Sequence, residues 1–144
     1  MKSIDEVIEV FQKHGQKVTP QRREILKILV NNKDHPKAEE IYRILKNRMP
    51  DVTLATVYNT LNVLRDLGMI ESIGVIGDDS VHYDPTTEAH DHLCCMRCKR
   101  IMDIEKKEPE VNFTQNEISG FQIVKRMVTY YGYCPECQKM LKTI

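Results

Sequence analysis

The sequence has neither an excess of charge of one sign nor a long apolar run. Its 144 residues include 21 lysines and arginines against 21 aspartates and glutamates. This balance excludes a uniformly basic protein but not a local basic patch, because nucleic acid responds to nearby charge. No apolar run approaches the roughly 20 residues of a membrane span, so we expect no membrane partner. The 41% apolar and 29% charged residues are typical of a globular protein of one or two domains.

The N-terminal part also lacks two features. The first residues, MKSIDEVIEV, contain no basic n-region, no apolar h-region and no cleavage site of a secretory signal. None of the five cysteines precedes position 94. With no indication of export we expect a reducing, cytoplasmic environment, in which clustered cysteines bind metal more often than they form disulfides.

The first 68 residues carry the pattern of four helices. Apolar residues recur there at helical spacing, and capping residues precede them. The expected start points are Ser3, Thr19-Pro20, His35-Pro36 and Thr53. The fourth helix is the most regular, with an apolar stripe that ends before Gly68 and comprises Leu54, Val57, Leu61, Leu64 and Leu67.

A β-hairpin is expected after the helices. Two short apolar runs, 70–76 and 81–84, flank the turn residues 77–80. Helices followed by a hairpin indicate a winged helix-turn-helix, which we place at residues 1–84. The segment 85–89 begins with proline, is polar and lacks periodicity, so we expect a hinge there.

Residues 90–144 are expected to form a second, smaller domain. Strand-like runs occur at 100–105 and 121–131, and a helix is expected near 109–118. Roughly 55 residues bury little surface, so a metal and a partner subunit would both stabilise this domain. The chain as a whole is therefore predicted to be an α+β protein.

The strongest chemical signal is a pair of Cys-x-x-Cys motifs. Cys95 and Cys98 form the first, and Cys134 and Cys137 form the second, 35 residues later. Four thiolates at this spacing predict tetrahedral zinc, and a closed four-cysteine shell is structural rather than catalytic. The alternatives are a pair of thiol redox motifs or unrelated cysteines. Cys94 is left over and is expected to be a small buried hydrophobe.

A second signal is the sequence His90-Asp91-His92. On an extended strand both imidazoles point to the same side. Asp84 at the end of the hairpin and Asp103 in a strand could add carboxylates to a metal site. Solvated surface charge is the alternative for these two aspartates.

A third signal is the polar face of the fourth helix. Opposite the leucine stripe lie short side chains that can contact base edges, namely Ala55, Thr56, Asn59 and Asn62, with Tyr58 at the margin of this face. Residues 13–33 carry a local charge of +5, which suits phosphate contact. An ordinary amphipathic helix with a solvated face is the alternative. The DNA contacts that we expect are Lys17, Arg22, Thr56, Tyr58, Asn59 and Asn62.

Several short motifs occur together in a fixed order. They are Thr19-Pro20-Gln21-Arg22, His35-Pro36, Ala55-Thr56-Val57-Tyr58-Asn59, His90-x-His92-x-x-Cys95-x-x-Cys98, Tyr131-Gly132 and Cys134-x-x-Cys137. With them the chain resembles the ferric uptake regulator family over nearly its whole length. The resemblance implies a winged helix, a hinge and a C-terminal α/β dimerisation domain. It also implies a homodimeric, metal-dependent transcriptional repressor, not an enzyme, that binds a palindromic operator in double-stranded DNA.

Within this family the chain is most similar to the peroxide-response repressors. The resemblance implies a regulatory Fe(II) or Mn(II) site beside the structural zinc site. Its five ligands would be His35, Asp84, His90, His92 and Asp103. It also implies that peroxide and Fe(II) oxidise His35 and His90, and that the loss of either ligand releases DNA. The manganese form should repress and resist peroxide.

Three other interpretations stay open from the sequence. An iron, zinc or manganese uptake regulator of the same family would lack peroxide chemistry, although Asp103 and Asn59 argue against it. A metalloenzyme could use an open coordination position at the His/Asp site, but no general base or substrate motif is evident. A thiol redox switch at the cysteines would release zinc under mild peroxide.

Overall fold

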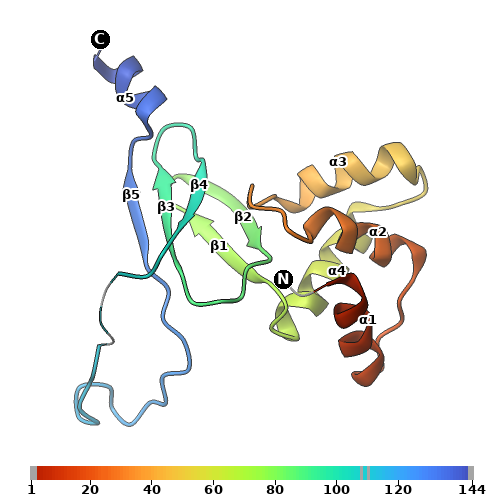
Figure 1. Ribbon diagram of the computed structural model, residues 1–144, viewed down its shortest axis with the longest axis horizontal. Coiled ribbons are helices and arrows are strands. Elements are labelled where there is room, and N and C mark those ends of the chain that lie inside the picture. The colour runs from red at the N-terminus through yellow and green to blue at the C-terminus, as the bar shows by residue number, and fades with distance from the viewer. Residues whose placement is uncertain (1–2, 108, 110, 143–144) are drawn as a thin grey trace. The chain divides into compact units, whose positions relative to one another are not determined.

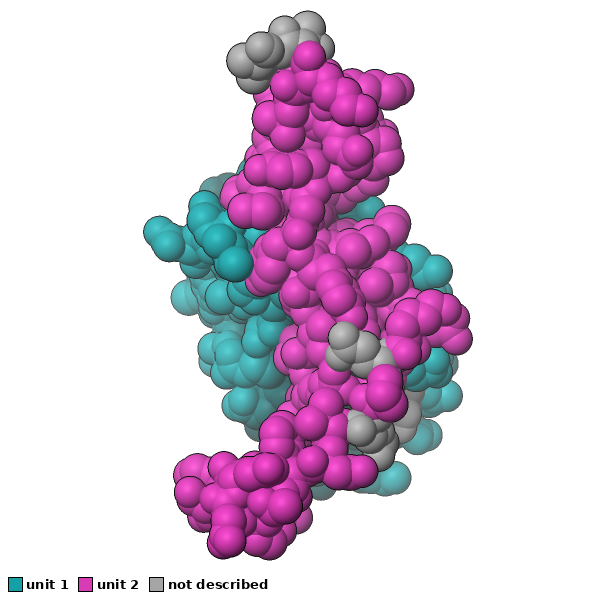
Figure 2. Space-filling model, turned by 90° about the vertical axis from the view of Figure 1, so that its left-hand side faces the viewer, with its two compact units in different colours: residues 1–88 teal, residues 89–144 magenta. Residues whose placement is uncertain are grey.

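The computed structural model describes residues 3–107, 109 and 111–142. These residues fall into two compact units, Met1–Glu88 and Ala89–Ile144, coloured separately in Figure 2. The division lies inside the segment 85–89 for which a hinge is predicted. The elements in chain order are α1 (Ile4–Lys13), α2 (Pro20–Leu29), α3 (Ala38–Arg48), α4 (Leu54–Asp66), β1 (Glu71–Val75), β2 (Asp78–Asp84), β3 (Asp91–Cys95), β4 (Ile101–Ile104), β5 (Thr129–Gly132) and α5 (Pro135–Lys142).

The first unit consists of four helices followed by a hairpin, as predicted (Figure 1). Three of the four helices begin at the expected caps. The hydroxyls of Ser3, Thr19 and Thr53 each accept a backbone N–H from the residue three positions on, at 3.2–3.3 Å. These bonds satisfy donors that the first helical turn leaves without an intrahelical partner. The third helix differs, because Lys37 at its start makes no side-chain cap.

The apolar stripe of α4 lies at the centre of the first unit's core. Val57, Leu61 and Leu64 have no exposed surface, whereas Leu54 and Leu67 at the ends of the stripe are half-buried. The stripe packs in one cluster with residues of the other three helices, including Val7, Phe11, Ile25, Leu26, Leu29, Ile41 and Leu45. The opposite side of α4 therefore stays available at the surface.

The predicted turn of the hairpin, 77–80, was wrong at both ends. The turn is Ile76-Gly77, and Asp78 to Ser80 already belong to β2. Gly77 has a φ of +77°, which glycine adopts without steric cost, so two residues suffice to reverse the chain. An irregularity in the register between Gly74 and Val75 accommodates the shorter connection.

The second unit is built on a three-stranded sheet in the order β4-β3-β5 (Figure 1). β3 pairs antiparallel with β4 and parallel with β5. The predicted strand at 100–105 is confirmed by β4. α5 follows directly after β5 and was not predicted, although Pro135 at its first position is a typical start signal.

Two predictions for the region between β4 and β5 were wrong. The run 121–131 forms a strand only from Thr129 on, and in place of the helix near 109–118 the described residues form one capped turn at 114–120. Thr114 and Glu117 bond reciprocally, each side chain accepting the other's backbone N–H. This capping box begins the turn at Thr114, and Gly120, with a φ of +75°, ends it. Residues 108 and 110 lie outside the described part.

None of the helices that the structure describes is both long and apolar enough to cross a membrane. The longest, α4, has 13 residues.

Candidate metal centres and nucleic-acid interface

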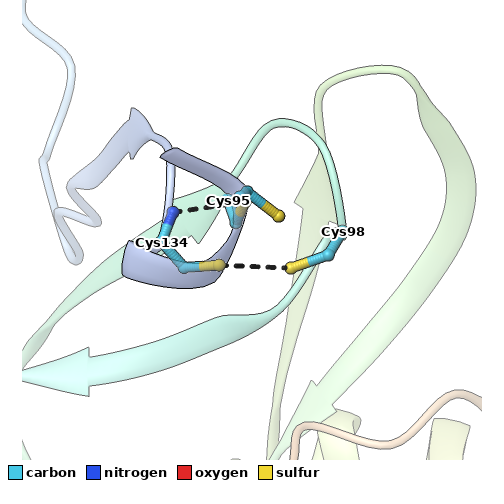
Figure 3. Close-up of side chains that lie close together, drawn as sticks. Cys95, Cys98 and Cys134 are labelled. Atoms are coloured by element: carbon cyan, nitrogen blue, oxygen red, sulfur yellow. Dashed lines mark hydrogen bonds between the residues drawn. The ribbon is translucent and has the colours of Figure 1, made fainter. Parts of the chain in front are cut away.

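Four cysteines of the second unit converge on one point. Their Sγ atoms all lie within 4.8 Å of one another, and the four residues are Cys95, Cys98, Cys134 and Cys137. The Sγ atoms of Cys98 and Cys134 are 3.8 Å apart (Figure 3). Tetrahedral zinc with bonds of about 2.3 Å places its sulfurs about 3.8 Å apart. The donor type, number and spacing therefore fit zinc, and the sequence prediction of a four-cysteine cluster is confirmed.

The sheet brings the two cysteine pairs together. Cys95 ends β3, and its parallel partner in β5 is Gly132, two residues before Cys134. The Met96 backbone N–H donates to the Gly132 carbonyl at 2.8 Å, which fixes the two chain segments beyond the strands. Cys137 lies buried in the first turn of α5. The 35-residue interval between the pairs is thus closed by strand pairing.

The backbone around the cluster prepares one sulfur for the thiolate form. Burial acts to raise the pKa of Cys95, but the backbone N–H groups of Cys134, Cys98 and Arg97 outweigh it and lower that pKa to about 6. The Cys134 N–H lies 3.4 Å from the Cys95 sulfur. An N–H that points at sulfur stabilises its negative charge.

The neighbouring sulfur behaves in the opposite way. The Cys137 N–H acts to lower the pKa of Cys134, but burial and the adjacent thiols and Glu136 raise it to about 12. Thiolates this close repel one another, so they ionise together only around a cation.

A second donor group lies at the other end of β3. The Nε2 atoms of His90 and His92 are 3.0 Å apart, and they lie 3.3 Å and 3.4 Å from the same oxygen, Oδ1 of Asp103. His92 and Asp103 are register partners of β3 and β4. Neighbouring ligands of an ion with bonds of about 2.1 Å are about 3 Å apart. These two imidazoles and one carboxylate fit one side of a metal site.

A third donor group lies in the first unit. Nε2 of His35 is 3.5 Å from Oδ2 of Asp84, and both side chains are 1% exposed. Asp84 is the last residue of β2. His35 has a φ of +51°, a conformation that a non-glycine residue adopts only where its surroundings impose it. This imidazole–carboxylate pair again suits a metal that prefers nitrogen and oxygen ligands.

The sequence did not indicate what holds His35 in that conformation. Nδ1 of His82 donates to the His35 carbonyl at 3.0 Å, and its Nε2 lies 3.2 Å from Oδ2 of Asp78. The same Asp78 oxygen is 3.2 Å from Nζ of Lys37. The Tyr83 N–H donates to the Pro36 carbonyl at 3.0 Å. The chain around His35 is thereby paired with β2, the strand that carries Asp84.

Asp78 is a charged anchor for this arrangement. Its pKa lies well below the ordinary range because the Ser80 backbone N–H and side chain donate to it, as do His82 and Lys37. Sequence spacing gives no sign of this cluster, since Lys37 and Asp78 are far apart along the chain.

The predicted DNA-contact residues lie on the first unit. Lys17, Arg22, Thr56 and Asn59 line one open cleft between the loop before α2 and the exposed side of α4. Lys17, Tyr58, Asn59 and Asn62 are exposed, and Thr56 is half-buried with its hydroxyl 3.0 Å from that of Thr53. Tyr58 is 37% exposed.

Two residues of this face have partners that the sequence did not predict. The Tyr58 hydroxyl donates to Oε1 of Glu39 in α3 at 2.6 Å. Arg22, expected as a phosphate contact, donates to Asn59 Oδ1 at 3.1 Å and to the Lys17 carbonyl at 2.8 Å. The structure thus links the basic loop and α3 to the side chains of α4.

The structure brings together the four cysteines, then His90, His92 and Asp103, and separately His35 and Asp84. Cys94 is buried, as expected. That the two histidine–aspartate groups serve one ion stays a prediction.

Comparison with known proteins places the chain in a family. The model of the ferric uptake regulator family matches residues 13–131. The peroxide operon regulator of Bacillus subtilis is 36% identical over 137 residues, which cover 94% of each chain.

Two solved structures extend the comparison. The ferric uptake regulator of Helicobacter pylori has a TM-score of 0.74 at 24% identity, over 95% of each chain, and supports the fold alone. The peroxide-sensing regulator PerR of Streptococcus pyogenes has a TM-score of 0.57 at 28% identity, over 96% of this chain and 95% of that one. Since the family model matches most of its length, the chain belongs to the ferric uptake regulator family.

Proposed function

We propose that this protein is a metal-dependent, DNA-binding transcriptional repressor that senses peroxide. The observation that carries the proposal is the presence of two chemically distinct donor sets in one chain. One set consists of four thiols, and the other consists of imidazoles and carboxylates. Such a division suits one metal that maintains structure and another that responds to conditions.

The four cysteines hold structural Zn(II). A closed shell of four thiolates is structural rather than catalytic, and the lowered pKa of Cys95 favours its thiolate form. Zinc bound there adds binding free energy to the folding of a small unit.

The regulatory metal is Fe(II) or Mn(II), bound by His35, Asp84, His90, His92 and Asp103. Carboxylates are hard ligands, and together with imidazoles they suit Fe(II) or Mn(II), whereas thiolates suit zinc. Because the ligands come from both units, metal binding favours one arrangement of the units, by no more than the metal's differential affinity for the two arrangements.

Peroxide acts through the same residues. Bound Fe(II) supplies the reactivity with peroxide, and His35 and His90 are the expected oxidation targets. An oxidised imidazole is a poorer ligand, so the chain loses the metal and releases DNA. The resemblance to the family implies that iron-sensing members commonly carry Glu at the position of Asp84 or Asp103 and Arg at that of Asn59. The aspartates and Asn59 of this chain, and its similarity to the peroxide operon regulator of Bacillus subtilis, support this assignment over a metal-uptake regulator.

The partner on the protein side is a second copy of the chain. Large apolar side chains of the second unit are exposed in the single chain, with Phe121 at 75% and Val124 at 87%. A homodimer would cover such a surface. Two copies of α4 would then read the two halves of a palindromic operator in the cytoplasm.

The test is operator binding by the zinc-loaded homodimer with Fe(II) or Mn(II), before and after low micromolar peroxide. We expect binding with either metal and release by peroxide only with Fe(II). Binding that peroxide never reverses would instead indicate a metal-uptake regulator. Metal-independent binding would contradict the proposal, and saturable substrate turnover by the metal-loaded protein would indicate an enzyme.

A further inference from the structure

We propose that Arg22 is a positioning residue, which holds the side-chain amide of Asn59 in one orientation so that base discrimination by Asn59 depends on it. The inference deepens the proposed function and rests on it, since it takes α4 as the helix that reads DNA.

The guanidinium of Arg22 is fixed from several directions. Nη1 donates to the Lys17 carbonyl at 2.8 Å and to Oε1 of Gln16 at 3.3 Å, and Nη2 donates to Oδ1 of Asn59 at 3.1 Å. The guanidinium carbon lies 5.7 Å from the ring centroid of the buried Phe11. A planar fork bonded at both nitrogens and placed over a ring has little freedom to move.

This bonding separates Arg22 from its basic neighbours. Lys17 and Arg23 are exposed, whereas Arg22 is half-buried. Both of its terminal nitrogens donate hydrogen bonds to oxygens of the protein. Phosphate contacts come from charges that can reach the DNA backbone. From the sequence alone the three residues belong to one basic patch. The hydrogen bonds of Arg22 within the protein instead suit a residue that positions Asn59.

The contact also settles the orientation of the Asn59 amide. The oxygen and nitrogen of an asparagine side chain are often hard to distinguish. A guanidinium carries only donors, so the atom that faces it must be the oxygen. The Asn59 nitrogen, with its two hydrogens, then has a defined direction before any DNA is bound.

A defined amide direction has a consequence for reading bases. Asparagine recognises adenine through one donor and one acceptor, and each must face the matching atom on the base edge. An amide that rotates freely can adapt to several edges, whereas one held by Arg22 matches fewer. Removal of Arg22 is therefore expected to lower discrimination at the base pair that Asn59 reads.

The experiment uses the full-length, zinc- and Mn(II)-loaded protein and duplexes selected by it from a random pool. Affinity is then measured for duplexes changed one base pair at a time, as a function of salt, for wild type, Arg22→Ala, Arg22→Lys, Asn59→Ala and the double variant Arg22→Ala/Asn59→Ala. Lys17→Ala is the matched control, because it removes an exposed charge and leaves the carbonyl that Arg22 contacts. Zinc content and thermal unfolding show that each variant is folded.

We expect wild type to discriminate at one base pair by about 5- to 140-fold, the range of a good amide–base contact. Arg22→Ala, Arg22→Lys and Asn59→Ala should lose discrimination at that same pair, with no further loss in the double variant. Arg22→Lys should keep the wild-type salt slope, because the charge is retained. Lys17→Ala should reduce the salt slope by about one and affect all sequences alike.

The inference is overturned if Arg22→Ala weakens all duplexes equally and Arg22→Lys restores binding, since that is the behaviour of a phosphate contact. Additive losses in the double variant would also overturn it. NMR of the side-chain amides tests the positioning role of Arg22 separately from the proposed function, because this measurement needs no DNA. The Asn59 amide should be ordered in wild type and mobile in Arg22→Lys, and an equally mobile amide in both proteins would overturn the inference even where no operator is bound.

Discussion

Among single residues, Tyr58 shows how the fold sets the protonation state of a side chain on the exposed face of α4. Its hydrogen bond to Glu39 raises the pKa of Tyr58 to about 12. The neutral hydroxyl is the stabilised form. The contribution of this hydrogen bond to the free energy of unfolding is therefore complete below pH 10, the ordinary pKa of tyrosine, and is lost as the pH rises through about 12.

The prediction is that Glu39→Gln moves the Tyr58 pKa back toward its ordinary value. Phenolate absorbance of wild type minus that of Tyr58→Phe isolates the titration of this one tyrosine, and the same difference in the Glu39→Gln background supplies the comparison. A wild-type midpoint near that of a free tyrosine would show that the contact with Glu39 is absent in solution.

Asp103 is the second residue that yields a prediction. Asp103→Glu keeps the charge, so Fe(II)- or Mn(II)-dependent DNA binding should largely survive. The added methylene moves the carboxylate by about 1.5 Å and lets it chelate with both oxygens or cover an open coordination position. Release from DNA by peroxide should then be slower than in wild type. Asp79→Glu, which lengthens an exposed carboxylate, is the control, and equal release rates in all three proteins would rule out this role for Asp103.

The role of a single residue could be predicted from the sequence only where its partners lie close to it along the chain. The four cysteines were found because each pair is three residues apart and the spacing itself is chemical information. The His82 bond to the His35 carbonyl and the Arg22 bond to Asn59 join residues 47 and 37 positions apart. Such contacts exist only once the tertiary fold is formed, so no sequence pattern indicates them.

At the scale of elements, α4 carries both core residues and the surface that we propose to read DNA. Leu61 is fully buried and Asn62 beside it is exposed. We expect Leu61→Ala to lower the free energy of unfolding of the first unit by about 2–5 kcal/mol, because it leaves a cavity. Asn62→Ala should change it by about 0.5 kcal/mol or less. Urea unfolding followed by circular dichroism makes the comparison, and similar losses in both variants would mean that the stripe does not form the core.

Elements were predicted well where local signals agree with packing. In the first unit, apolar stripes indicate four helices and hydroxyl caps mark the start of three of them, and the structure confirms all four. In the second unit, apolar residues at 121–128 predict a strand, yet their side chains are mostly exposed in the single chain. Apolar residues alone do not specify a strand when no other described part of the chain packs against them.

At the scale of the whole molecule, zinc should couple the second unit's fold to assembly. Cys95→Ser or Cys134→Ser removes one of four thiolates, and much of the zinc affinity and of the folding free energy depends on the complete shell. We expect both variants to lose zinc and dimerisation together, measured by zinc content and sedimentation. Cys94→Ala, which lies outside the cluster, should keep both. A stable dimer without zinc would contradict the structural role.

The central claim is that peroxide acts on the protein's own metal ligands. The most direct measurement is mass spectrometry of peptides that contain His35 and His90, after peroxide treatment of the Fe(II)-loaded and Mn(II)-loaded protein. We expect an added oxygen atom on one or both histidines in the iron form, in step with the loss of DNA binding, and unmodified histidines in the manganese form. Release of DNA with both histidines unmodified, or equal oxidation with either metal, would contradict it.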